Sequence, residues 1–142
     1  MKQIRKYVNL LKEIIKNSYS PYSAFPVAAL LVTKNNIYFG VNIENVSFSL
    51  TICAERVAIF KAISEGDRNF QKLIIYTPTK NFIYPCGACL QVLKEFKKDL
   101  EVILVNKNGK IRKERLKNLI KNFSPPSLKK NNRGRASFCS IG

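Results

Sequence analysis

Val-Ala-Ala-Leu-Leu-Val at residues 27–32 and Ile-Tyr-Phe-Gly-Val at Ile37–Val41 flank the turn residues Lys34, Asn35 and Asn36. An unbroken apolar run that stops at a turn is typical of a strand buried on both faces. The second run is rich in β-branched and aromatic residues, which favour a strand beside the first. The two runs together predict a β-hairpin.

The rest of the chain alternates between helical and strand-like patterns. Apolar residues at helical spacing predict four helices, at 1–17, 53–65, 86–98 and 115–120. Two more buried strands are expected at 73–76 and 102–105, each following one of the two middle helices. Helices that alternate with short buried strands indicate an α/β fold in which helices cover both faces of a sheet.

Length and composition are those of one globular domain. The chain has 142 residues, 46% of them hydrophobic, which is enough to bury a core without disulfides. The longest apolar run, 25–32, is too short to cross a bilayer. Charged residues interrupt every apolar stretch near the N-terminus, which does not look like a secretory signal. We therefore expect a cytoplasmic protein without a membrane segment.

The net charge of +16 is unevenly distributed. Eleven basic residues and one acidic residue lie within 107–135. Such a segment could contact phosphates in a nucleic acid. A solvated charged face is the commoner meaning of a charge run, and we expect that here.

The cysteines suggest a metal site. Cys86-Gly87-Ala88-Cys89 is a C-x-x-C pair, and a third thiol, Cys53, lies upstream. The chain contains no histidine, so any zinc would be held by thiolates, with or without carboxylates. Three protein ligands leave one open position, which is typical of catalytic zinc. A thioredoxin-like redox pair and a structural zinc site completed by Cys139 are the alternatives.

Glu55 and Arg56 favour the catalytic interpretation. At a helix N-terminus the cap residue has non-helical dihedral angles, so Cys53 and Glu55 could both face one metal. A carboxylate beside an open zinc position can carry protons during hydrolysis. Three thiolates on Zn²⁺ leave a formal charge of −1, which two helix N-termini and the Arg56 guanidinium would offset.

Five motifs occur together: S-P-Y-S-A-F at 20–25, V-N-I-E-N at 41–45, C-A-E-R at 53–56, S-E-G-D at 64–67 and P-C-G-A-C at 85–89. With them the chain resembles the zinc-dependent nucleoside deaminases, and most closely the small homotetrameric cytidine deaminases, over residues 4–128. Two positions depart from the family pattern. No glycine follows Val27, and Phe48 stands where relatives often carry Tyr.

The resemblance implies a fold, a reaction and a set of site residues. The fold is a three-layer α/β/α domain with a mixed sheet of about five strands, spanning 1–128. The tail at 129–142 has no counterpart in the family pattern, and its basic, polar composition predicts disorder, so we expect Cys139 to be a free thiol. The reaction is hydrolytic deamination of cytidine or deoxycytidine, in which zinc-bound hydroxide attacks C4 and Glu55 protonates N3. One Zn²⁺ per subunit binds Cys53, Cys86 and Cys89.

The resemblance also assigns substrate contacts. Asn42 and Glu44 hydrogen-bond the ribose, Phe25 and Ala54 contact the substrate, and Phe123 reaches the site of a neighbouring subunit in a homotetramer.

Three rival functions remain: a deaminase acting on cytosine within a nucleic acid, a deaminase of a nucleoside antibiotic such as blasticidin, and a non-enzymatic basic zinc module that binds nucleic acid.

Overall fold

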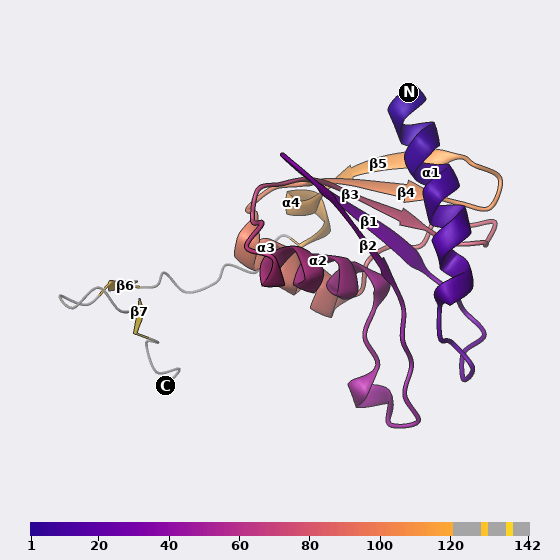
Figure 1. The fold of residues 1–142 in the computed structure, drawn as a ribbon, viewed down its shortest axis with the longest axis horizontal. Helices are drawn as coiled ribbons and strands as arrows, with labels where there is room; N and C mark the ends of the chain where they lie inside the picture. The colour runs from indigo at the N-terminus through magenta and orange to yellow at the C-terminus, as the bar shows by residue number, and fades with distance from the viewer. Residues whose placement is uncertain (121–128, 131–135, 138–142) are drawn as a thin grey trace.

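A five-stranded mixed sheet forms the centre of the molecule (Figure 1). The computed structural model describes residues 1–120, 129–130 and 136–137. The strands are β1 (Ala28–Thr33), β2 (Ile37–Val41), β3 (Phe70–Tyr76), β4 (Glu101–Val105) and β5 (Ile111–Arg115). Their order is β2-β1-β3-β4-β5. Only the β3–β4 pair within this sheet is parallel.

Helices cover both faces of the sheet. They are α1 (Lys2–Ile14), α2 (Ala54–Ser64), α3 (Gly87–Phe96) and the single turn α4 (Leu116–Leu119). Figure 1 shows α1 on one side of the sheet and α2 with α3 on the other. The α/β/α layering predicted from the sequence is therefore confirmed.

The described residues form two hydrophobic cores, one on each face of the sheet. Strand β1 contributes to both cores, because all six of its residues are buried. Successive strand side chains point to opposite faces. Leu30 packs in the core beneath α1, with Leu11 and Ile103. Leu31 packs in the core beneath α2 and α3, together with Ile59. The apolar run at 27–32 thus contributes side chains to the cores on both faces of the sheet.

Gly40 in β2 brings the sheet into close contact with α2. A Cβ atom at this position would lie 2.7 Å from the backbone nitrogen of Ala58 and closer still to the carbonyl oxygen of Ala54. Real Cβ atoms essentially never approach within 3.0 Å of another heavy atom. The first turn of α2 can occupy its position only because residue 40 has no side chain.

The hairpin and the two middle helices agree with prediction, whereas the C-terminal part differs. No strand was predicted at Ile111–Arg115, which forms β5. Four of its five residues are charged, so the pattern lacks the apolar alternation of a half-buried strand. The helix expected at 115–120 forms only the single turn α4, at Leu116–Leu119. The helix expected at 1–17 ends as α1 at Ile14 and continues as a 3₁₀ turn, Ile15–Asn17.

Two short strands are described beyond residue 120. β6 (Lys129–Lys130) and β7 (Ala136–Ser137) pair antiparallel with each other. Phe123 and Cys139 lie outside the described residues, and the proposed division at residue 128 stays a prediction. Within the part of the chain that the structure describes, no helix is long and apolar enough to cross a membrane.

Candidate active site

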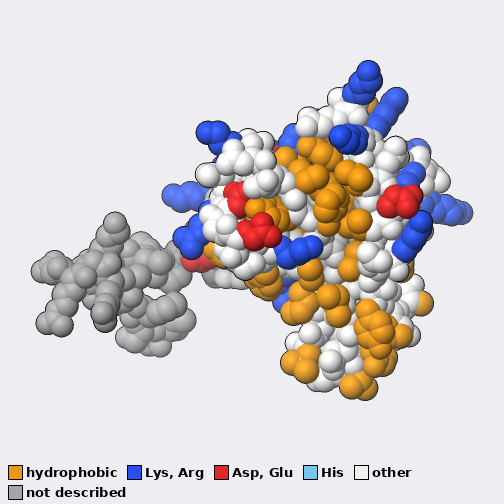
Figure 2. Space-filling view, in the orientation of Figure 1, with side chains coloured by type: hydrophobic (Ala, Val, Ile, Leu, Met, Phe, Trp, Pro, Cys, Tyr) orange, Lys and Arg blue, Asp and Glu red, His pale blue; other side chains and the backbone are white. Residues whose placement is uncertain are grey.

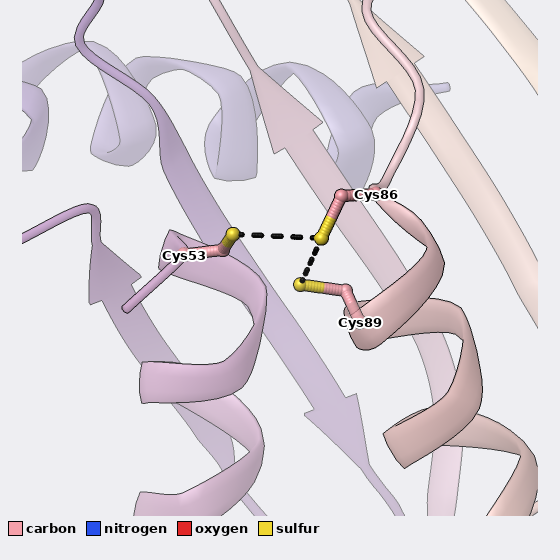
Figure 3. Close-up of side chains that lie close together, drawn as sticks. All are labelled: Cys53, Cys86 and Cys89. Atoms are coloured by element: carbon pink, nitrogen blue, oxygen red, sulfur yellow. Dashed lines mark hydrogen bonds between the residues drawn. The ribbon is translucent and has the colours of Figure 1, made fainter. Parts of the chain in front are cut away.

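The three predicted metal ligands meet between the N-termini of two helices (Figure 3). Cys53 is the N-cap of α2 and Cys86 the N-cap of α3, both with extended backbone dihedrals. Cys89 lies in the first turn of α3. The cap geometry inferred from the sequence is confirmed, because it lets Cys53 and Cys86 point out of their helices toward each other.

The cluster fits zinc in both chemistry and spacing. The Sγ atom of Cys86 lies 3.6 Å from that of Cys53 and 3.6 Å from that of Cys89. All three sulfurs lie within 4.8 Å of one another. Three sulfurs around tetrahedral Zn²⁺, at the usual bond length, would be about 3.8 Å apart. The residues present therefore need only small movements to hold the ion.

Electrostatics favour the thiolate form at Cys53, whereas the hydrogen bond to Cys53 and burial raise the pKa of Cys89. A hydrogen bond from Cys89, helped by the Arg56 guanidinium, lowers the pKa of Cys53 to about 5. The Nη2 atom of Arg56 lies 3.5 Å from the Cys53 sulfur and also 3.5 Å from the carbonyl oxygen of Thr51. The Nε atom of Arg56 is buried and has no partner among the described residues. Positive helix termini and Arg56 together surround the cluster that would carry negative charge.

Glu55 is buried beside the cluster. Its side chain is 5% exposed, and burial raises the pKa of the carboxyl to about 7. It lines a pocket of about 180 Å³ together with Cys53 and Cys86. A carboxyl that titrates near neutral pH, next to a metal cluster, is suited to proton transfer.

The predicted substrate residues divide into two groups. Ala54 and Asn42 line the pocket with Glu55, whereas Phe25 and Glu44 do not. Asn42 is buried and its Oδ1 accepts hydrogen bonds from Val27 N–H and the Ser18 hydroxyl. Its Nδ2 donates to the carbonyl oxygen of Phe25 at 2.8 Å. Asn42 thus holds the segment before β1 as well as facing the pocket.

Glu44 is bound to the loop that precedes Phe25. Its carboxylate accepts hydrogen bonds from the backbone N–H of Tyr22 at 2.9 Å and of Ser23 at 3.2 Å, and from the Ser23 hydroxyl. The Ser23 hydroxyl and the two backbone N–H groups lower the pKa of Glu44. Ala24, in the same loop, has a φ angle of 52°. That angle lies in the left-handed region, which is uncommon for a residue with a side chain.

Several pocket residues were not predicted. Besides the named side chains, the lining includes Val27, Thr51, Ile75, Ile83 and Tyr84. Thr51 and Tyr84 each lie two residues before a metal-ligating cysteine. That spacing is a signal that could have identified them, since the residues preceding a helix N-cap lie close to the helix N-terminus.

The fold and the site together define a class: an α/β protein with a three-thiolate metal centre and a buried carboxyl at two helix N-termini. A family model described as cytidine and deoxycytidylate deaminase zinc-binding region matches residues 1–105. Two similar proteins are the cytidine deaminases of Sporosarcina psychrophila and Halalkalibacterium halodurans. The first is 46% identical, covering 76% of this chain and 81% of that protein, and the second is 47% identical, covering 72% and 81%.

A solved structure agrees. The crystal structure of cytidine deaminase from Burkholderia pseudomallei superposes with a TM-score of 0.76 at 39% identity, covering 80% of this chain and 93% of that one. The chain belongs to the cytidine and deoxycytidylate deaminase family of zinc enzymes. Its cofactor is zinc, and the Cys53, Cys86 and Cys89 cluster is consistent with one ion per subunit.

Proposed function

We propose that the chain catalyses hydrolytic deamination of cytidine, deoxycytidine or both, releasing ammonia and leaving the uracil nucleoside. The observation that carries this proposal is the pairing of a three-cysteine cluster with a buried carboxyl in one pocket. A redox C-x-x-C pair would need neither the third thiol nor Glu55. A purely structural zinc site would need no pocket beside the metal.

Cys53, Cys86 and Cys89 would hold the zinc ion. When bound, zinc supplies Lewis acidity that lowers the pKa of a coordinated water molecule to about 7. Arg56, through its contact with the Cys53 sulfur, would offset the negative charge of the thiolates. The N-termini of α2 and α3, which Cys53 and Cys86 cap, would do the same.

Glu55 is the proposed proton carrier. Its carboxyl lies in the first turn of α2, immediately after the pocket-lining Ala54. Burial keeps the protonated and ionised forms close in free energy at neutral pH. Glu55 can therefore accept a proton from the attacking water and deliver it to N3 of the pyrimidine. It can then carry a second proton, from the hydroxyl group formed at C4, to the amino group, which leaves as ammonia.

Asn42 and Glu44 are the proposed ribose contacts. A carboxylate offers about four acceptor sites, and Glu44 uses three for the loop at Tyr22 and Ser23. It can still accept a hydrogen bond from a ribose hydroxyl. Asn42 likewise retains one Nδ2 proton after donating to Phe25. We propose that Phe25 and Ala54 pack against the nucleoside, with Asn42 fixing the position of Phe25.

A homotetramer is the proposed assembly. Large apolar side chains are exposed on the segment that links β2 to α2: Val46 at 77%, Phe48 at 73% and Leu50 at 63%. In Figure 2, hydrophobic side chains gather over the lobe that Figure 1 shows below the sheet. Exposed apolar surface of this kind favours an interface. The pocket of about 180 Å³ is also smaller than the ~300 Å³ usual for ligand sites, as expected if a neighbouring subunit completes it.

Phe123 would be the residue that a neighbouring subunit contributes. A cytoplasmic location and a role in pyrimidine salvage are further parts of the proposal. Three thiols hold zinc only while they stay reduced, which suits a reducing compartment. Sedimentation of the purified protein tests the assembly, and a monomer with full activity would contradict it.

Substrate tests separate the proposal from its rivals. The zinc-loaded protein is incubated with cytidine, deoxycytidine, cytosine, dCMP, blasticidin S and a cytosine-containing oligonucleotide, and ammonia release is followed. We expect turnover of the free nucleosides. Turnover of the oligonucleotide or the antibiotic alone would support those rivals instead, and turnover of none would leave the non-enzymatic module.

A variant tests the division of roles within the site. Glu55→Gln should retain zinc, because the amide replaces a carboxyl that is not a ligand. It should lose activity, because an amide carries no proton to N3. Zinc content by atomic absorption and ammonia release are the two measurements. Loss of zinc in this variant would mean that Glu55 is a ligand or a structural residue.

A further inference from the structure

Tyr84 lies in the segment between β3 and α3, two residues before Cys86. It lines the same pocket as Glu55 and Cys86. Its side chain is 42% exposed, although its neighbour Pro85 is buried. An aromatic ring that faces a pocket and is not packed into the core is available for contact with a ligand.

Two residues of β5 hold the Tyr84 hydroxyl. The Nη1 atom of Arg112 donates a hydrogen bond to it at 3.0 Å. The hydroxyl in turn donates to Oε1 of Glu114 at 3.3 Å. Arg112 and Glu114 are two residues apart in a strand, so both side chains point to the same face of the sheet. The hydroxyl therefore accepts one hydrogen bond from β5 and donates one to the same strand.

Arg112 also holds the same segment through a second aromatic residue. Its guanidinium carbon lies 5.1 Å from the centre of the Phe82 ring, within the range of a cation–π contact. Phe82 and Tyr84 stand on either side of the pocket-lining Ile83. Arg112, from strand β5, thus contacts both aromatic residues that flank Ile83 in the pocket wall.

We propose that Tyr84 is a further substrate-contacting residue, and that Arg112 and Glu114 are positioning residues that hold its ring in the pocket wall. This inference rests on the proposed deamination of a pyrimidine nucleoside. The ring would supply a flat apolar surface to the nucleoside before and during the reaction alike. Contacts that are equal in the ground state and the transition state act on KM and leave kcat unchanged.

Two single variants and their combination test the inference. Tyr84→Phe keeps the ring and removes the hydroxyl, and Arg112→Met keeps an extended apolar chain and removes the donor. Each should raise KM for cytidine about fivefold, the effect of one hydrogen bond, with kcat within about twofold of wild type. Because both remove the bond between Arg112 and the Tyr84 hydroxyl, the double variant should raise KM by clearly less than the ~25-fold of independent effects. Tyr84→Ala should raise KM about tenfold or more.

Lys113→Met is the matched control. Lys113 lies between the two positioning residues, and in the described structure it makes an exposed ion pair with Glu101 at 3.5 Å. Its side chain points to the opposite face from Arg112. It should leave KM unchanged. Zinc content and the thermal midpoint are measured for every variant, and the exposed Arg112→Met decides the question if Tyr84→Ala fails to fold.

Each outcome distinguishes this inference from the proposed function. If wild type deaminates cytidine but Tyr84→Phe and Arg112→Met keep the wild-type KM, the inference is wrong and the proposed function stands. Independent effects in the double variant, or an equal effect of Lys113→Met, would also overturn it. If wild type releases no ammonia from any pyrimidine nucleoside, the proposed function is wrong, and this inference, which rests on it, is wrong as well.

Discussion

Gly40→Ala changes the contact between β2 and α2 by a single methyl group. The new Cβ atom would lie 2.7 Å from the Ala58 nitrogen and even closer to the Ala54 carbonyl oxygen. Both obstacles are backbone atoms, so no side chain can rotate to make room. The first turn of α2 must move away from the sheet, and this turn carries Glu55, two residues after the metal-ligating Cys53.

The size of the effect follows from that geometry. Overpacking a close-packed core costs about 1–3 kcal/mol, and a clash with backbone belongs at the upper end, so we expect a loss of about 3 kcal/mol in the free energy of unfolding. Such a loss is a large share of the ~5–15 kcal/mol of a typical domain. Displacing a reacting group by about 1 Å can cost about 100-fold in rate, and we expect kcat/KM to fall by that order.

Urea unfolding of the zinc-loaded protein and ammonia release measure the two effects. Gly66→Ala is the control, because Gly66 has a φ angle of +80° and nothing among the described residues lies within 4 Å of the added Cβ. It should cost about 1 kcal/mol through backbone conformation alone and leave kcat/KM unchanged. If Gly40→Ala loses no more stability than Gly66→Ala, or keeps wild-type activity, the close approach of β2 does not position α2.

Three more predictions concern other parts of the molecule. Arg56→Ala should weaken zinc binding about tenfold or more in a chelator competition, because it removes the guanidinium 3.5 Å from the Cys53 sulfur; unchanged zinc affinity, stability and turnover would rule out this role. Ala24→Asn should raise the free energy of unfolding by about 0.5–1 kcal/mol, since asparagine tolerates the φ angle of 52° better than alanine, and a less stable variant would contradict this explanation. Hydrogen bonds, above all from the Thr33 hydroxyl, lower the pKa of Asp67, so Asp67 stabilises the fold fully above its unfolded pKa of about 3.9 and loses this contribution as the pH falls through the folded value. Wild type should therefore exceed Asp67→Asn in urea midpoint at pH 7, with the gap closing below about pH 4; a gap that does not change with pH would contradict the assignment.

The hairpin could be predicted from the sequence because burial on both faces leaves a plain signal. Every residue of 27–32 is apolar, and the structure buries β1 throughout. Strand β5 could not be predicted in the same way. It is a charged edge strand, and among the described residues it pairs with β4 alone. Its Arg112 and Glu114 contact Tyr84 rather than a hydrophobic core. Its position depends on tertiary contacts that no local periodicity encodes.

The metal ligands were more predictable than the substrate contacts. Cysteine spacing and the absence of histidine restrict the ligands to a few choices, and the structure brings all three thiols together. Asn42 and Glu44 carry no comparable local signal, and only the resemblance suggested them. Their hydrogen bonds to Val27, Tyr22 and Ser23 show a second role, in shaping the loop before β1, that a sequence motif cannot express.

The sheet topology explains why two motifs so far apart in the chain form one site. Strands β2 and β3 are both antiparallel to β1, so they run in the same direction. Helix α2 follows β2 and α3 follows β3, so both helices begin beyond the carboxyl ends of these strands. Ligands bind beyond the carboxyl ends of the strands in many open α/β sheets. Cys53 and Cys86 meet there as N-caps, and Gly40 sets how closely α2 approaches the sheet. Strand β5 contacts the same site through the hydrogen bond from Arg112 to Tyr84. The position of the metal site thus depends on strand direction as much as on the cysteines themselves.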